Sequence, residues 1–128
     1  MKQNLFFVMV ALGSMFSFAA SAEDNLKSVY DISLVASKTV LMHDECVRQG
    51  FIRDEAANAE ERFRASIEKT SGLSAADLGS EISGAQIADA EAQALVAAKS
   101  GAAPVADSTK CEEAQRGMAQ VTYAYGLE

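Results

Sequence analysis

The chain has 128 residues, of which 18 are acidic and 11 are basic, and its formal net charge is −7 at pH 7. This acidic balance disfavours nucleic acid and anionic membranes as electrostatic partners. It is compatible with a basic protein partner and equally with simple solubility. The length suits a single domain with a modest core once the N-terminal segment is set apart.

The first 22 residues have the three parts of a secretory signal peptide. Lys2 gives a positive start, residues 5–12 (LFFVMVAL) form an unbroken apolar run, and Ala20-Ser21-Ala22 is a small-x-small cleavage pattern. The alternative is an uncleaved membrane anchor, but a spanning helix needs about 20 mostly apolar residues and this run is shorter. We expect cleavage between Ala22 and Glu23, which leaves a single domain over residues 23–128. The product would be exported without a stable membrane anchor, to the periplasm in the first instance and alternatively to the medium.

The only two cysteines, Cys46 and Cys111, both lie in the expected mature chain. An even cysteine count in an exported protein indicates a disulfide. A redox pair is the first alternative, but such cysteines usually lie close together in sequence. A zinc site is the second, and it would need more ligands than two cysteines and His43. We therefore predict a structural disulfide.

The sequence pattern is all-α, because alanine is abundant, only one proline is present and no sustained period-2 alternation occurs. A first helix is expected over residues 25–49, with Gly50 as its stop. Its apolar arc is wide, which is typical of a central helix packed by several neighbours. A second, amphipathic helix is expected over residues 52–69, with one apolar face made of Ile52, Ala56, Ala59, Phe63 and Ile67.

The C-terminal half predicts shorter helices separated by an irregular segment. A short helix is expected over residues 74–82 and another over 85–99, and whether they form one bent helix or two stays open. Ser83 and Gln86 have the spacing of a capping box before the latter. Residues 100–108 read as a loop, and a last helix is expected over 109–125, capped by Thr109 and closed by Gly126.

The predicted disulfide adds a constraint on topology. Cys46 lies near the end of the first predicted helix and Cys111 in the first turn of the last one. A bond between them favours antiparallel packing of these two helices. The expected architecture is a small four-helix bundle-like domain, stapled across its first and last members.

No motif for catalysis or nucleotide binding is present, and no cofactor is expected. His43-Asp44-Glu45-Cys46 is the densest polar cluster, but consecutive helical residues point in different directions. His43 falls on the apolar side of its helix, where a satisfied, partly buried histidine is the usual outcome; as a functional residue it would be a general base or a pH-sensing group. A non-covalent haem or metal would need His43, Met42 and Met118 to converge. Tyr123 points away from the predicted core face and is a candidate contact residue.

Three functions remain after these exclusions. The first is a non-enzymatic protein-interaction module, such as an inhibitor, an immunity-type partner, an adaptor or a small chaperone. The second is a carrier that holds a small apolar molecule between its helices. The third is an enzyme that uses His43, which would require that side chain to lie in an open cleft beside a carboxylate.

Overall fold

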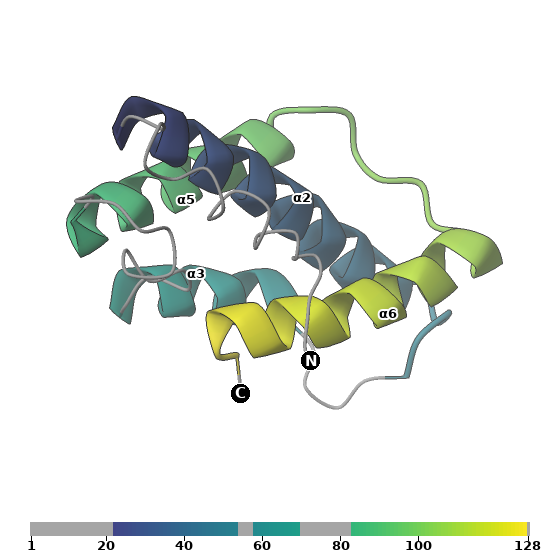
Figure 1. Cartoon of the computed structure of the whole chain (residues 1–128). Helices are drawn as coiled ribbons and strands as arrows, with labels where there is room; N and C mark the ends of the chain where they lie inside the picture. Colours follow the sequence, from purple (N-terminus) through teal and green to yellow (C-terminus); the bar gives the residue numbers. More distant parts are fainter. Residues whose placement is uncertain (1–21, 54–57, 70–82, 128) are drawn as a thin grey trace.

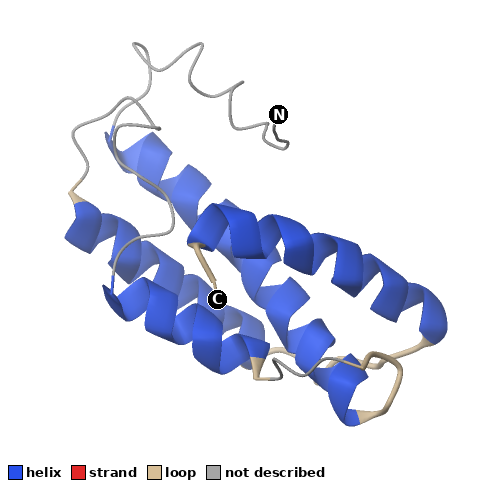
Figure 2. Cartoon of the chain, turned by 90° about the horizontal axis from the view of Figure 1, so that it is seen from below, coloured by secondary structure: helices blue, strands red, loops and turns tan. Residues whose placement is uncertain are grey.

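A computed structural model describes residues 22–53, 58–69 and 83–127 of the chain. Within these ranges the chain is all-helical, with four α-helices and no strand: α2 (Ala22–Arg48), α3 (Ala59–Lys69), α5 (Gly84–Lys99) and α6 (Ser108–Tyr125). In Figure 1 the pair α2 and α5 lies above the pair α3 and α6, and Figure 2 shows the same helices from below. The predicted helix over 74–82 and residues 1–21 of the predicted signal peptide lie outside the described residues.

Helix α2 is the central element, as its wide apolar arc predicts. It contacts each of the other three described helices, most extensively α5. The helix begins at Ala22, three residues before the expected start, and ends at Arg48. Gly50 follows with a φ of 86°, the left-handed conformation that glycine adopts without a steric penalty, so its predicted role as the stop is confirmed.

Helix α5 runs parallel to α2, whereas α6 runs antiparallel to it. Val29 near the start of α2 packs against Ile87 near the start of α5. In contrast, Cys46 at the end of α2 is bonded to Cys111 at the start of α6. The predicted antiparallel arrangement of the first and last helices is thus confirmed. Small buried residues, among them Ser37 and Ala94 at 0% exposure, allow α2 and α5 to approach closely.

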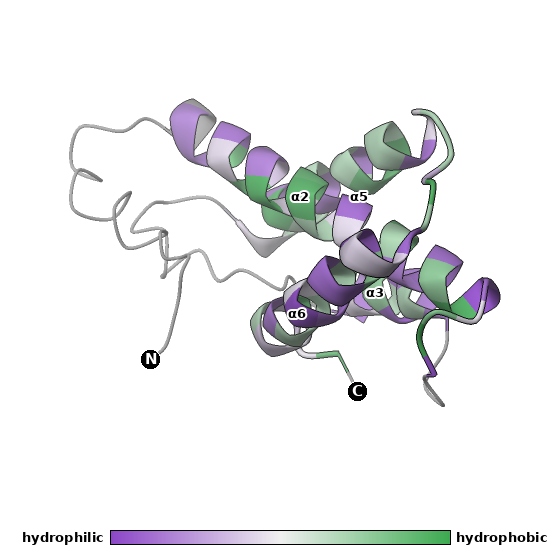
Figure 3. Ribbon diagram, turned by 90° about the vertical axis from the view of Figure 1, so that its right-hand side faces the viewer, coloured by the Kyte–Doolittle hydropathy of each residue, from purple (hydrophilic) through white to green (hydrophobic). Residues whose placement is uncertain are grey.

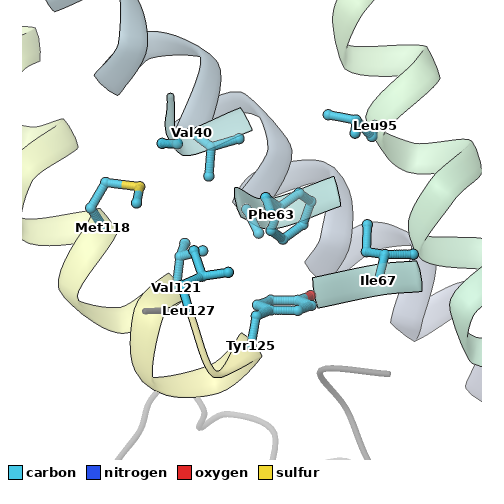
Figure 4. Packing of buried hydrophobic residues seen from close by; sticks show 10 residues of the cluster. Val40, Phe63, Ile67, Leu95, Met118, Val121, Tyr125 and Leu127 are labelled. Carbon is cyan, nitrogen blue, oxygen red and sulfur yellow. The ribbon is translucent and has the colours of Figure 1, made fainter. Parts of the chain in front are cut away.

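The main core lies where all four helices meet, and its side chains point toward one another in Figure 4. Phe63 of α3 and Tyr125 of α6 contact edge to face, with ring centroids 4.9 Å apart. Aromatic pairs in this geometry stabilise by about 1 kcal/mol beyond the area they bury. The buried members of the cluster are Ala36, Val40, Ala59, Phe63, Ile67, Leu95, Met118, Val121, Tyr125 and Leu127.

The predicted second helix, over 52–69, is wrong at its start, because α3 begins at Ala59. The backbone N–H groups of Phe51 and Ile52 both donate to the carbonyl oxygen of Cys46, which turns the chain back at the end of α2. Ile52 is buried against the disulfide instead of extending the α3 face. Asn58, with a φ of 69°, then precedes the first turn of α3.

Helix α5 begins as the sequence indicates, but α6 does not. The side chains of Ser83 and Gln86 form the predicted capping box at the start of α5. For α6 the N-cap is Asp107 in place of Thr109, and its carboxylate accepts from the backbone N–H of Lys110 at 2.8 Å. The helix accordingly starts at Ser108, and Gly126 closes it as expected, with a φ of 64°.

A close approach of α2 and α6 leads to the first testable prediction. A Cβ built on Gly117 would lie 2.9 Å from Cγ2 of Thr39. We expect Gly117→Ala to lower the free energy of unfolding, because an overpacking penalty of about 1–3 kcal/mol exceeds the helix-propensity gain of about 1 kcal/mol. In a Thr39→Ser background the methyl group is gone, and the same change should stabilise. Chemical denaturation of the parent, the two single variants and the double variant measures the change in unfolding free energy in each background. Destabilisation of equal size in the two backgrounds would contradict this contact.

Candidate interaction site

The disulfide holds together one end of the helical domain, here called the stapled end. Cys46 and Cys111 are bonded with a Cα–Cα distance of 5.8 Å, and both are buried. Ile52, from the turn after α2, is buried beside them, and Ala106, just before α6, packs against the same cluster. Two loops distant in sequence are therefore anchored at one point.

The four residues of the polar run His43-Asp44-Glu45-Cys46 each have a different role at this end. His43 is buried, with 4% of its surface exposed. Asp44 reaches across to α3, where its carboxylate accepts from the backbone N–H groups of Ala59 at 2.6 Å and Glu60 at 2.9 Å. It thus serves as an N-cap supplied by another helix, and Cys46 forms the disulfide.

Glu45 belongs to a surface network at the last turn of α2. Arg48 donates from Nε to Glu45 at 3.1 Å and also from Nη2, and the side-chain amide of Gln49 donates to the same carboxylate. The Arg48 hydrogen bonds, followed by that of Gln49, lower the pKa of Glu45. The same pairing raises the pKa of Arg48. Both groups therefore stay charged beside the loop that leads to α6.

That loop, residues 100–107, forms one wall of a surface groove of about 310 Å³ at the stapled end. The opposite wall comes from the second half of α2 and the start of α3. Lys99 at the end of α5 contacts Glu60 across the groove. The lining residues are Leu41, Asp44, Glu45, Arg48, Glu60, Ala98, Lys99, Gly101, Ala102, Ala103 and Pro104.

Two large apolar side chains lie exposed beside the anchored residues of the stapled end. Phe51, next to buried Ile52, is 49% exposed, and Val105, next to half-buried Ala106, is 69% exposed. Figure 3 colours much of the two loops that carry them as hydrophobic. The other large apolar residues with high exposure among the described residues, Val35, Val96 and Tyr123, lie on helices. Single exposed apolar residues are ordinary, so Phe51 and Val105 are candidate contact residues by their position at the stapled end alone.

A second, buried polar group lies at the other end of α6. The hydroxyls of Tyr125 and Ser33 are 3.1 Å apart, and Ser66 donates to the backbone carbonyl of Tyr125. Burial raises the pKa of Tyr125, the hydrogen bond with Ser33 opposes the rise, and the charge of Glu91 adds to it. Glu91 itself is fully buried. This carboxyl was not among the predicted site residues, although its position between Ile87 and Leu95, four residues from each, indicates the core face of α5.

The sequence-predicted candidates do not come together in one place. His43 is enclosed in the domain, while Tyr123, on the outward face of α6, is 75% exposed. Met42 packs against the disulfide cluster and Met118 belongs to the main core, so the two methionines lie in different clusters. Among the described residues no group of three His, Cys, Asp or Glu side chains could hold a metal ion.

A second surface groove, of about 450 Å³, lies between the first turns of α2 and α5, with Leu26, Tyr30 and Ala90 among its lining residues. It is open, and its rim carries Lys27 and Asp89. None of the described helices is both long and apolar enough to cross a membrane.

Comparison of the chain with protein-family models, with curated proteins and with solved structures finds no match. The site is therefore interpreted from its own geometry.

The cap supplied by Asp44 makes the second prediction. Asp44→Ala leaves two backbone N–H groups of α3 without their acceptor, and we expect it to lower the free energy of unfolding by about 1–2 kcal/mol. Asp31→Ala is a matched control, because Asp31 forms an exposed ion pair with Lys27, worth less than about 1 kcal/mol. Urea denaturation of both variants measures the difference, and equal losses would exclude the capping role.

Proposed function

We propose that this protein is an exported, non-enzymatic protein-interaction module that binds its partner with the stapled end. The observation that carries the proposal is the exposure of Phe51 and Val105 on two loops whose neighbouring residues are packed on the buried disulfide. Loops held in place lose little conformational entropy on binding, and aromatic residues are enriched at protein interfaces.

The other two functions receive less support. An enzyme that uses His43 needs that side chain in an open cleft, and His43 is 4% exposed. A ligand carrier needs an enclosed cavity between its helices, whereas the groove between α2 and α5 is open to solvent and has Lys27 and Asp89 in its lining. Export is supported by the signal-peptide pattern together with a disulfide of the kind that forms in oxidising compartments.

Site-specific photocrosslinking in cells that export the protein tests the proposal. A photoreactive amino acid is placed at Phe51 or Val105, and as matched controls at Val35 and Val96, which have similar or higher exposure. We expect both stapled-end positions to crosslink to the same single partner. The crosslink from Phe51 should be lost in a Val105→Asp variant, and the crosslink from Val105 should be lost in a Phe51→Asp variant. Equal yields from the control positions, or none from any position, would refute binding through this end.

A further inference from the structure

The loop between α5 and α6 has an exposed surface whose residues indicate the class of partner for the proposed interaction module. Its central sequence is Ala102-Ala103-Pro104-Val105-Ala106. The residues on either side of the proline are exposed, and Val105 is the most exposed apolar side chain of the stapled end. Exposed, non-helical segments of small residues are the segments that proteases accept.

The loop has neither helical nor strand structure over residues 102–107. A proline fixes its own φ near −65° and biases the preceding residue, here Ala103, toward extended conformations. Asp107 is extended, with φ −146° and ψ 173°. The loop contains no cis peptide bond and no residue with positive φ among those described. Residues 102–107 therefore form an irregular connection between α5 and α6, in which the proline restricts the backbone of residues 103 and 104.

The two sides of Val105 are held independently. On its N-terminal side, Ala103 and Pro104 line the groove whose other wall is α2. On its C-terminal side, Ala106 packs on the disulfide cluster, and Asp107 caps α6. Cys111, one turn into α6, is covalently bonded to Cys46. A break in the chain beside Val105 would leave both new ends tethered to the same rigid body.

We infer that this loop binds the active-site cleft of a serine protease with a small apolar primary pocket, of the elastase type, and that the protein inhibits it. The inference rests on the proposed function and names the partner class for the same stapled end. Val105 occupies the primary pocket, where a small aliphatic side chain fits and a bulky or cationic one does not.

Tethering explains why binding leads to inhibition. The serine Oγ of the protease attacks the carbonyl carbon of Val105, the Val105–Ala106 bond breaks, and the serine proton passes to the departing Ala106 amine. In an ordinary substrate the amine diffuses away and water hydrolyses the acyl-enzyme. Here Ala106 stays packed, so the amine attacks the ester, the peptide bond reforms and the proton returns to the serine. The complex therefore turns over slowly.

The experiment measures inhibition of pancreatic elastase by the purified protein with its disulfide intact, with trypsin as the comparison enzyme and a small chromogenic peptide as substrate. We expect inhibition of elastase and none of trypsin. Val105→Lys should weaken elastase inhibition by at least about a hundredfold and create trypsin inhibition. The reason is that the primary pocket of each protease selects the side chain at this position by its size and charge. Val96→Lys, at a position 67% exposed on α5, is the matched control and should leave both unchanged.

Mass spectrometry after long incubation gives a second readout. Slow cleavage at Val105–Ala106 should release a fragment beginning at Ala106 only after reduction, because Cys111 ties it to Cys46. Rapid, complete cleavage without inhibition would overturn the inhibitor inference, and so would inhibition unaffected by Val105→Lys, or no interaction. Such a failure leaves the photocrosslinking result at Phe51 intact, so loss of the protease partner and loss of the interaction module are distinguishable.

Discussion

Removal of the disulfide by replacing Cys46 and Cys111 with alanine is expected to lower the free energy of unfolding by about 4 kcal/mol. The bond closes a loop of 65 residues, so its loss returns a large conformational freedom to the unfolded chain. It also removes the anchor on which Ile52 and Ala106 pack. For a domain of this size we expect the melting temperature to fall by on the order of 20 °C.

Circular dichroism melting of the double variant, and of the unaltered protein with and without reductant, measures this effect. Each single alanine variant serves as a control, because it leaves one thiol without closing the loop and should lie close to the double variant. A double variant that melts within about 3 °C of the parent would contradict the stabilising role of the bond. The elastase assay on the same variant tests whether inhibition requires the loop to be anchored by the disulfide, and not its sequence alone.

The helical class, the central position of α2 and the staple could all be predicted from residue patterns. Apolar periodicity and Gly50 predicted the position of α2, and the predicted export signal was the reason to expect Cys46 and Cys111 to be bonded. The start of α3 could not be predicted in the same way, because it depends on Asp44, a side chain in another helix. Local sequence cannot show a cap supplied across space, and the apolar spacing from Ile52 to Ala59 suited a continuous helix.

The buried polar group escaped prediction for a different reason. Charged residues are almost never fully buried unless paired, so residue type alone predicts an exposed position for Glu91. Its neighbours Ile87 and Leu95 mark the apolar face of α5, and the structure buries all three. The exposed loop, by contrast, was predicted as a loop from its small residues and proline. The residue pattern did not predict that Ala106 and Ile52 pack on the same disulfide cluster, on which the proposed interaction site depends.

Raising the pH above about 10 is expected to unfold the protein through Tyr125. Burial raises the pKa of this phenol above the value it has in the unfolded chain. The folded state therefore retains a proton that the unfolded state releases, so stability is complete below pH 10 and falls as the pH rises further. Each pH unit between the two pKa values removes up to about 1.4 kcal/mol.

Tyr125→Phe isolates this effect. The variant loses the hydroxyl contact with Ser33, so at pH 7 its free energy of unfolding should be lower by about 1–2 kcal/mol. Above pH 10 its stability should fall less steeply than that of the parent, and the two curves should converge. Phenolate absorbance, taken as the parent minus the variant, should appear together with the loss of helical circular dichroism. Phenolate formation at Tyr125 while the helices remain intact would show that its hydroxyl is accessible, and would overturn its place at the junction of the four helices.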